Sequence, residues 1–131
     1  MYVLDTNIIS AILKDNEETK KILFKKILSG KEIFINAITY YEIKRGLLKT
    51  NDIGRLERFN LFCFEHNLIF IDNIDILNIA SEIYAYLNKK GQSIGDADIL
   101  IAAMTMSKNF ILVTNDKHFA RIENLKIENW L

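Results

Sequence analysis

The ten residues MYVLDTNIIS, Met1–Ser10, decide how the chain begins to fold. Val3 and Leu4 form a short apolar run that is typical of a buried strand. Apolar residues then recur at helical spacing, at Ile8, Ile9, Ile12 and Leu13. Asp5, Thr6 and Asn7 stand at the junction, where residues of these types commonly cap a helix. A second interpretation is that Asp5 is one of several carboxylates gathered at one edge of a sheet, and the remaining sequence has to decide between the two.

The bulk composition is that of an ordinary globular chain. The 131 residues include no proline and 17 basic against 17 acidic side chains. A chain of this size is predicted to form one domain, residues 1–131. Zero net charge argues against a protein that holds nucleic acid by bulk charge.

The sequence carries no sign of export or membrane insertion. No apolar run reaches the roughly 18 residues of a membrane span, and no signal peptide is recognisable, so we expect a cytoplasmic protein without membrane contact. The single cysteine, Cys63, stands among apolar residues and is predicted to be a core thiol in a reducing compartment.

Short apolar runs alternate with helical stretches along the whole chain. The helical stretches include 56–64 and 76–87, where apolar residues recur every three or four positions. This alternation predicts an α/β fold with three layers, α/β/α, around a central parallel sheet of four to five strands. The predicted strands are Tyr2–Leu4, Ile33–Ile35, Leu68–Ile71, Phe110–Thr114 and, more weakly, Leu125–Ile127.

Five acidic residues are predicted to meet at one edge of that sheet. Asp5 and Asp116 follow the first and fourth strands, while Glu42, Asp96 and Asp98 stand near the starts of helices. In a parallel sheet the ends of the strands and the starts of the following helices collect on the same side, where such sheets bind ligands. The topology therefore brings these carboxylates together.

Each of these acids also has an ordinary structural explanation. Thr39 and Glu42 have the spacing of a capping box, with Thr39 as the N-cap. Asp96 after a glycine is a natural N-cap, and Asp98 suits a first helical turn, where the helix dipole favours anions. Asp116 suits an Asx turn or the cap of a short helix. Taken singly, none of the four requires a function.

Taken together, the acids favour a metal site. Ser, Thr or Asn would cap these helices equally well, whereas two carboxylates at about 4 Å repel by roughly 4 kcal/mol at an effective dielectric constant of about 20. A divalent cation removes this repulsion, and oxygen ligands select Mg²⁺ or Mn²⁺ over zinc. His66 and His118 are predicted to be isolated, and no phosphate-binding loop or nucleophile elbow is present. Metal-assisted phosphoryl chemistry is what remains.

Four motifs in this order give the chain a family resemblance. The stretches VLDTN, TYYEIKRG, IGDADILIAA and LVTNDKHF resemble those of the PIN-domain ribonucleases, and most of all the VapC toxins of bacterial and archaeal toxin–antitoxin pairs. The resemblance extends from Met1 to the closing LKIENWL. It implies a PIN-like domain that hydrolyses RNA phosphodiester bonds with Mg²⁺ or Mn²⁺, forms a homodimer and is neutralised by a small cognate antitoxin protein.

The same resemblance assigns residues to the site. It implies that the catalytic and metal-binding acids are Asp5, Glu42, Asp98 and Asp116. Accessory residues at the site would be Asp96, Thr6, Asn7 and Thr114.

Several alternatives stay open at this level. A receiver-like phosphoacceptor domain would need an acidic pair after the first strand, where this chain has Asp5 alone. A non-catalytic PIN scaffold would not need all four acids. Basic residues near the acids could contact RNA phosphates, or could form solvated helix faces with pairs such as Glu42–Arg45. These basic residues are Lys44, Arg45, Lys49 and Lys117.

Overall fold

The first strand lies at the centre of the sheet, as its apolar sequence predicts. In the computed structural model, which describes residues 1–131, Tyr2–Leu4 forms β1. All three residues are buried because neighbouring strands flank β1 and helices cover both faces of the sheet. The sheet is entirely parallel with the order β3-β2-β1-β4-β5, which confirms the predicted α/β class. The other strands are β2 (Ile33–Asn36), β3 (Asn67–Ile69), β4 (Ile111–Val113) and β5 (Ile127–Glu128).

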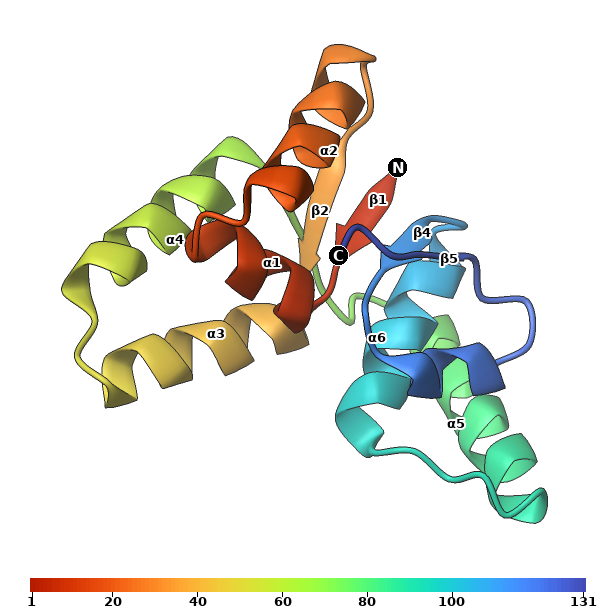
Figure 1. Ribbon diagram of the computed structural model, residues 1–131. Helices are drawn as coiled ribbons and strands as arrows, with labels where there is room; N and C mark the ends of the chain where they lie inside the picture. Colours follow the sequence, from red (N-terminus) through yellow and green to blue (C-terminus); the bar gives the residue numbers. More distant parts are fainter.

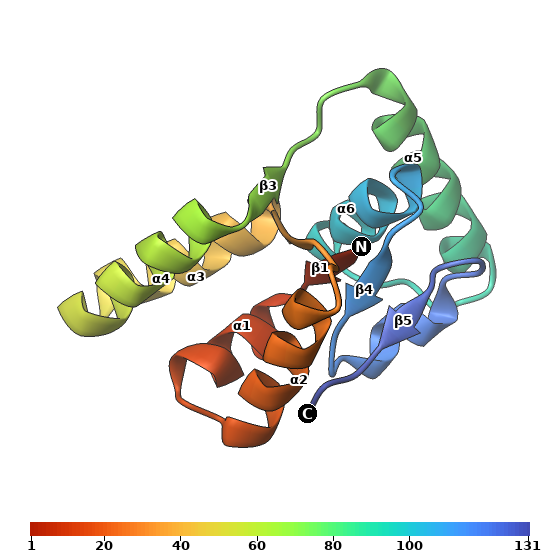
Figure 2. The same cartoon turned by 90° about the horizontal axis from the view of Figure 1, so that it is seen from above.

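Six α-helices complete the outer layers (Figures 1 and 2). One core cluster draws its helical residues from α1 (Thr6–Leu13), α2 (Glu17–Leu28), α3 (Ala37–Lys49) and α4 (Ile53–Glu65). The other cluster lies against α5 (Ile74–Lys89), α6 (Asp96–Ser107) and the 3-10 helix η1 (Lys117–Arg121). None of the helices is both long and apolar enough to cross a membrane.

The alternation of side chains along β1 divides the core in two. Val3 belongs to the cluster under α5 and α6, whereas Tyr2 and Leu4 belong to the cluster under α1 to α4. This division follows from the period of two in a strand. The apolar stripe predicted for α1 is buried in full, at Ile8, Ile9, Ile12 and Leu13. Cys63 is half-buried against the same cluster, and burial raises the pKa of its thiol to about 11.

Two predicted strand ends are wrong by two residues, for a reason that pairing explains, and the other differences are of one residue. The third strand was expected to continue to Ile71, but β3 ends at Ile69, opposite the last residue of β2. Beyond that point the edge strand has no partner, and Phe70 and Ile71 are exposed. The last strand begins at Ile127 rather than Leu125, because Leu125 packs into the core instead and only Ile127 and Glu128 pair with β4.

Candidate active site

Three neighbouring strands end within one residue of one another at the edge that the acids occupy. Leu4 of β1 lies opposite Ile35 of β2 and Val113 of β4. The residues after β1 and β4 therefore meet at this edge, and the backbone N–H of Asp5 donates to the carbonyl of Val113 at 2.9 Å.

Asp5 is buried, and its side chain does not cap a helix. It occupies the N-cap position of α1 but makes no side-chain cap hydrogen bond, so the capping interpretation is wrong for this residue. Its Oδ2 instead accepts a hydrogen bond from the Thr114 hydroxyl at 2.7 Å and one from Nδ2 of Asn7 at 3.2 Å. Burial raises the pKa of the Asp5 carboxyl, and the hydrogen bond from Thr114 partly opposes that rise.

Asn7 and Thr114 join the ends of β1 and β4 around that carboxylate. Oγ1 of Thr114 accepts from the backbone N–H of Asp116 at 3.0 Å and from Nδ2 of Asn7 at 3.4 Å. Oδ1 of Asn7 accepts from the backbone N–H of Asn115 at 2.9 Å. The two side chains thus fix the position of Asp5 relative to the loop that carries Asp116.

Glu42 is not part of a capping box, contrary to the prediction from its spacing. Helix α3 begins at Ala37, and Asn36 is its N-cap, with Oδ1 accepting from the backbone N–H of Thr39 at 2.8 Å. Glu42 consequently lies in the second turn, where no backbone N–H needs a cap. The Thr6 hydroxyl donates to Oε1 of Glu42 at 3.2 Å, which links this acid to the start of α1.

The buried residues Asn36 and Thr39 support the contact between Thr6 and Glu42. Asn36 and Thr39 are both fully buried, and Nδ2 of Asn36 donates to Oγ1 of Thr39 at 3.0 Å. Oγ1 of Thr39 in turn lies 3.5 Å from Oγ1 of Thr6. The sequence interpretation missed this role of Asn36, although an asparagine directly after an apolar run is a recognisable cap signal.

Asp96 and Asp98 lie on different sides of α6. The N-cap is Gly95, so the prediction that Asp96 caps this helix is wrong. Two residues correspond to about 200° of rotation in an α-helix, which separates the two side chains. Asp96 is exposed and lines a groove with Leu77 and Tyr84 of α5. Asp98 is half-buried at the sheet edge.

Electrostatic coupling connects Asp98 to the other acids. Burial raises the pKa of Asp98, and the negative charges of Asp116, Asp5 and Glu42 raise it further. The charges of Glu42 and Asp116 likewise contribute to the raised pKa of Asp5. The four acids thus form one coupled group at this edge.

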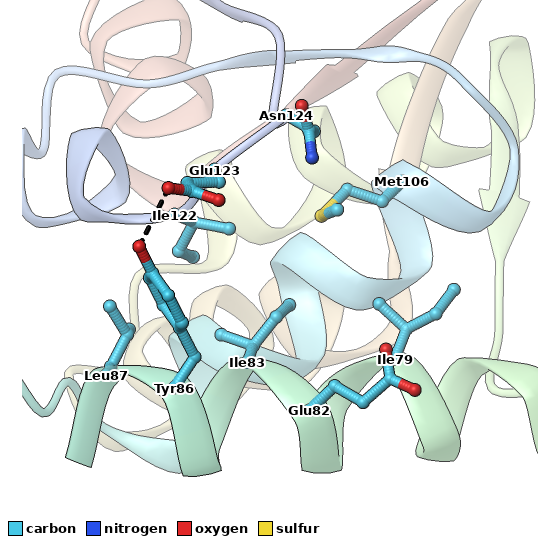
Figure 3. Close-up of a pocket in the computed structure, with 9 residues that line it drawn as sticks. All are labelled: Ile79, Glu82, Ile83, Tyr86, Leu87, Met106, Ile122, Glu123 and Asn124. Atoms are coloured by element: carbon cyan, nitrogen blue, oxygen red, sulfur yellow. Dashed lines mark hydrogen bonds between the residues drawn. The ribbon is translucent and has the colours of Figure 1, made fainter. Parts of the chain in front are cut away.

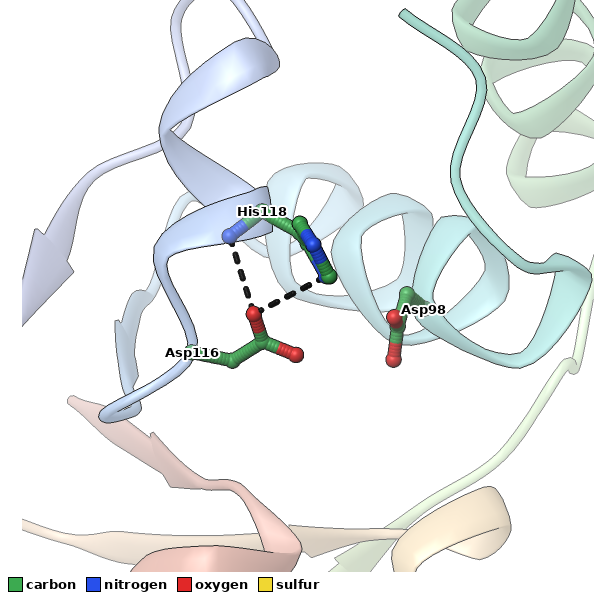
Figure 4. Close-up of side chains that lie close together, drawn as sticks. All are labelled: Asp98, Asp116 and His118. Atoms are coloured by element: carbon green, nitrogen blue, oxygen red, sulfur yellow. Dashed lines mark hydrogen bonds and ion pairs between the residues drawn. The ribbon is translucent and has the colours of Figure 1, made fainter.

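His118 is not isolated, contrary to the prediction. Asp116 is the N-cap of η1, as its position suggested, and its Oδ1 accepts from the backbone N–H of His118 at 2.9 Å. The tight turn also brings Nδ1 of His118 to 3.2 Å from the same oxygen. Three side chains here could each offer one ligand atom to a metal ion, and these atoms lie within 4.8 Å of one another (Figure 4). They belong to Asp98, Asp116 and His118. His66, by contrast, packs against Phe62, with ring centroids 4.5 Å apart.

The donor set suits a hard divalent cation. Carboxylate oxygens predominate, and Mg²⁺ and Mn²⁺ prefer such ligands. A bound cation would also relieve the mutual repulsion that, together with burial, raises the pKa values of Asp5 and Asp98. The observed residues therefore fit the metal that the sequence motifs imply.

A cavity lies elsewhere in the molecule, away from the acids. Its volume is about 240 Å³, and it lies between α5 and the segment after η1 (Figure 3). Ile79, Ile83 and Leu87 give it an apolar wall, and the Tyr86 hydroxyl donates to Oε1 of Glu123 at 2.7 Å beside it. It contains none of the predicted site residues.

Comparison with known proteins places this chain in a family. The chain belongs to the PIN-domain family, since residues 2–125 match the model of that domain. Within the family it is similar to VapC ribonucleases. It is 31% identical over 138 residues to ribonuclease VapC2 of Haemophilus influenzae, a match that covers 99% of this chain and 98% of that protein.

Two further relatives extend the comparison. The chain is 28% identical over 137 residues to the tRNA(fMet)-specific endonuclease VapC of Shigella flexneri, covering 98% of this chain and 97% of that protein. Its fold matches a chain in the crystal structure of VapBC2 from Rickettsia felis bound to a promoter DNA fragment. That match has a TM-score of 0.89 and 28% identity, and covers 99% of this chain and 98% of the other.

Proposed function

We propose that this chain is a metal-dependent endoribonuclease that acts as the toxin of a VapBC-type toxin–antitoxin pair. The observation that carries the proposal is the coupled carboxylate group at the sheet edge, in a chain that is similar over its whole length to VapC ribonucleases. A receiver-like phosphoacceptor is set aside, because the chain matches the PIN domain and has one acid after β1.

Asp5, Glu42, Asp98 and Asp116 are the proposed metal ligands and catalytic acids. When bound, Mg²⁺ or Mn²⁺ would supply an activated water and stabilise the leaving oxygen. Asp5 and Asp98 would hold the principal ion, while Glu42 and Asp116 would add oxygen ligands or orient the attacking water. The water would lose a proton as its oxygen bonds to phosphorus, the P–O bond to the leaving nucleotide would break, and the leaving oxygen would take up a proton.

Neighbouring side chains position three of these four acids. Thr114 and Asn7 orient Asp5, and Thr6 orients Glu42, through the hydrogen bonds described above. His118 contacts Asp116 and holds its carboxylate toward Asp98. Asp96 receives no metal contact in this proposal because it lies on another side of α6.

The proposed protein partner is a small antitoxin, and α1 with α3 and α4 offers it a groove that leads to the acids. Thr6 and Glu42 line the end of the groove at the site, and Lys14, which follows the last residue of α1, lines it further along. Leu13 also lines the adjoining part, where Leu61 of α4 is 57% exposed. An extended antitoxin segment that carries a basic residue would fit a groove ending at carboxylates. A cytoplasmic homodimer is the expected state of the free toxin.

RNA cleavage by the purified protein tests the proposed function. A tRNA pool is the first substrate to try, since the Shigella flexneri relative is named as a tRNA(fMet)-specific endonuclease. We expect defined cleavage products with Mg²⁺ or Mn²⁺, none with EDTA, and none from an Asp98→Asn preparation purified in parallel. Equal cleavage by both preparations would indicate a contaminating nuclease, and no cleavage by a folded, metal-replete parent would favour the non-catalytic PIN scaffold.

A further inference from the structure

Tyr41 and Arg45 form an exposed aromatic–cation pair on α3. Cζ of Arg45 lies 5.0 Å from the centroid of the Tyr41 ring, which places the guanidinium over one face of the ring. Tyr41 is nevertheless 60% exposed, and Arg45 is exposed as well. The pair thus presents both an aromatic surface and a planar cation to solvent.

The pair belongs to the same stripe of α3 as Glu42. Residues three and four apart are neighbours on a helix surface, so Ile38, Tyr41, Glu42 and Arg45 follow one another along one side of α3. Ile38 packs against the core cluster that contains the buried residues of α6. The Ile38 end of the stripe therefore lies on the side of α3 toward α6 (Figure 1).

Within the chain this pair has no other partner. Neither Arg45 nor the Tyr41 hydroxyl takes part in a side-chain hydrogen bond or ion pair, and the Glu42–Arg45 pairing suggested by the sequence does not form. The other arginines of this region are engaged: Arg55 pairs with Asp52, and Arg58 pairs with Asp15. The neighbouring Tyr40 hydroxyl likewise accepts a hydrogen bond from Lys44 at 2.8 Å.

We propose that Tyr41 and Arg45 form a stacking surface for a base of the RNA substrate and thereby contribute to substrate specificity. The proposal rests on the ribonuclease function. Bases of unpaired RNA stack on aromatic rings and on guanidinium planes, and this pair offers both. Tyr41 directly precedes Glu42, and Arg45 lies about one helical turn after it. A base next to the scissile phosphate extends the existing Arg45–Tyr41 stack while the phosphate lies at the acids.

Cleavage kinetics on a labelled single-stranded RNA oligonucleotide test this assignment. Tyr41→Leu is expected to raise KM about tenfold with little change in kcat, because loss of one base stack weakens binding without touching the acids. Tyr41→Phe keeps the ring and should retain the parental KM. Phe24→Leu, which removes an exposed aromatic side chain from α2, is the matched control and should also behave as the parent.

The outcomes separate stacking from other roles. If Tyr41→Leu retains the parental KM, or lowers kcat instead, the pair is not a base-stacking surface. If only Arg45→Met weakens binding and also reduces the salt dependence, Arg45 contacts a phosphate and the stacking proposal is wrong. Failure of the parent to cleave any RNA would refute the nuclease function itself, which is a distinguishable result. Melting temperatures of all variants verify that each is folded.

Discussion

The Thr114 hydroxyl donates a 2.7 Å hydrogen bond to Oδ2 of Asp5, and both side chains are buried. This contact joins the ends of two neighbouring strands and opposes the rise in the pKa of Asp5 that burial causes. A residue that would otherwise be unremarkable after β4 therefore controls both the position and the charge of the first acid.

Replacement of Thr114 tests that control. Thr114→Val removes a donor to a buried carboxylate and an acceptor for the Asp116 N–H, so the free energy of unfolding should fall by about 1–3 kcal/mol. The pKa of Asp5 should rise, and Mn²⁺ should bind more weakly at a given pH, as measured by calorimetric titration. Thr114→Ser keeps the hydroxyl and should restore both properties. Parental Mn²⁺ affinity in the folded Val variant would show that this hydrogen bond does not tune the site.

Substitution of Asn36 should lower the stability of the fold, whereas substitution of Glu42 should not. Asn36→Ala removes the N-cap of α3 and should lower the free energy of unfolding by about 0.5–2 kcal/mol. Glu42→Gln should leave the melting temperature unchanged or raise it, because Glu42 caps nothing. Cleavage should nevertheless fall at least about 100-fold, since even residues that only support metal ligands contribute up to about that much. A fully active Glu42→Gln protein would remove Glu42 from the proposed site.

The pH dependence of the metal-free protein follows from the raised pKa values of Asp5 and Asp98. A carboxyl whose pKa is higher in the folded than in the unfolded state costs no stability below its ordinary pKa of 3.8. The cost grows as the pH rises through the folded-state pKa. In EDTA, Asp98→Asn should therefore exceed the parent in melting temperature by a margin that increases as the pH is raised above 3.8.

The comparison with the parent isolates the site from other titrations. Asp15 has a lowered pKa because of Lys20 and Arg58, so its contribution to stability increases as the pH rises. Because both proteins contain Asp15, this contribution cancels in the comparison. A margin that stays constant or shrinks with rising pH would contradict mutual repulsion among the acids.

Expression in a bacterial host tests the biological role. The proposed toxin should arrest growth, and co-expression of the small protein encoded beside it should restore growth. An Asp98→Asn variant expressed to the same level should not arrest growth. Normal growth with abundant parental protein, together with no cleavage in vitro, would favour the scaffold alternative.

The sequence predicts the central part of the fold because several signals agree there. The apolar run at Val3 and Leu4 and the helical stripe from Ile8 onward each indicate one element type, and the structure confirms both. The edge strands were predicted less well, since the end of β3 depends on where β2 stops pairing, which no local pattern encodes.

The gathering of the acids at one edge was predictable, whereas the contacts that support them were not. Parallel topology alone brings Asp5, Asp98 and Asp116 to one edge, as the structure confirms. The capping role of Asn36 was missed because Thr39 and Glu42 offered a competing capping pattern a few residues later. His118 was missed because its contact with Asp116 arises from a 3-10 turn, whose geometry the residue types do not specify.

The central claim is that these carboxylates hold a divalent cation. Its most direct test is thermal melting of the parent, Asp98→Asn and Asp96→Asn in EDTA, in Mg²⁺ and in Mn²⁺. An ion that binds only the folded site should stabilise the parent by about 2.7 kcal/mol at a hundredfold excess over Kd. Asp98→Asn should be more stable than the parent without metal and should lose most of the metal-induced gain. Asp96→Asn, on another side of the same helix, should respond to metal as the parent does. If Asp98→Asn also responds as the parent does, the acids are structural and the metal site is contradicted.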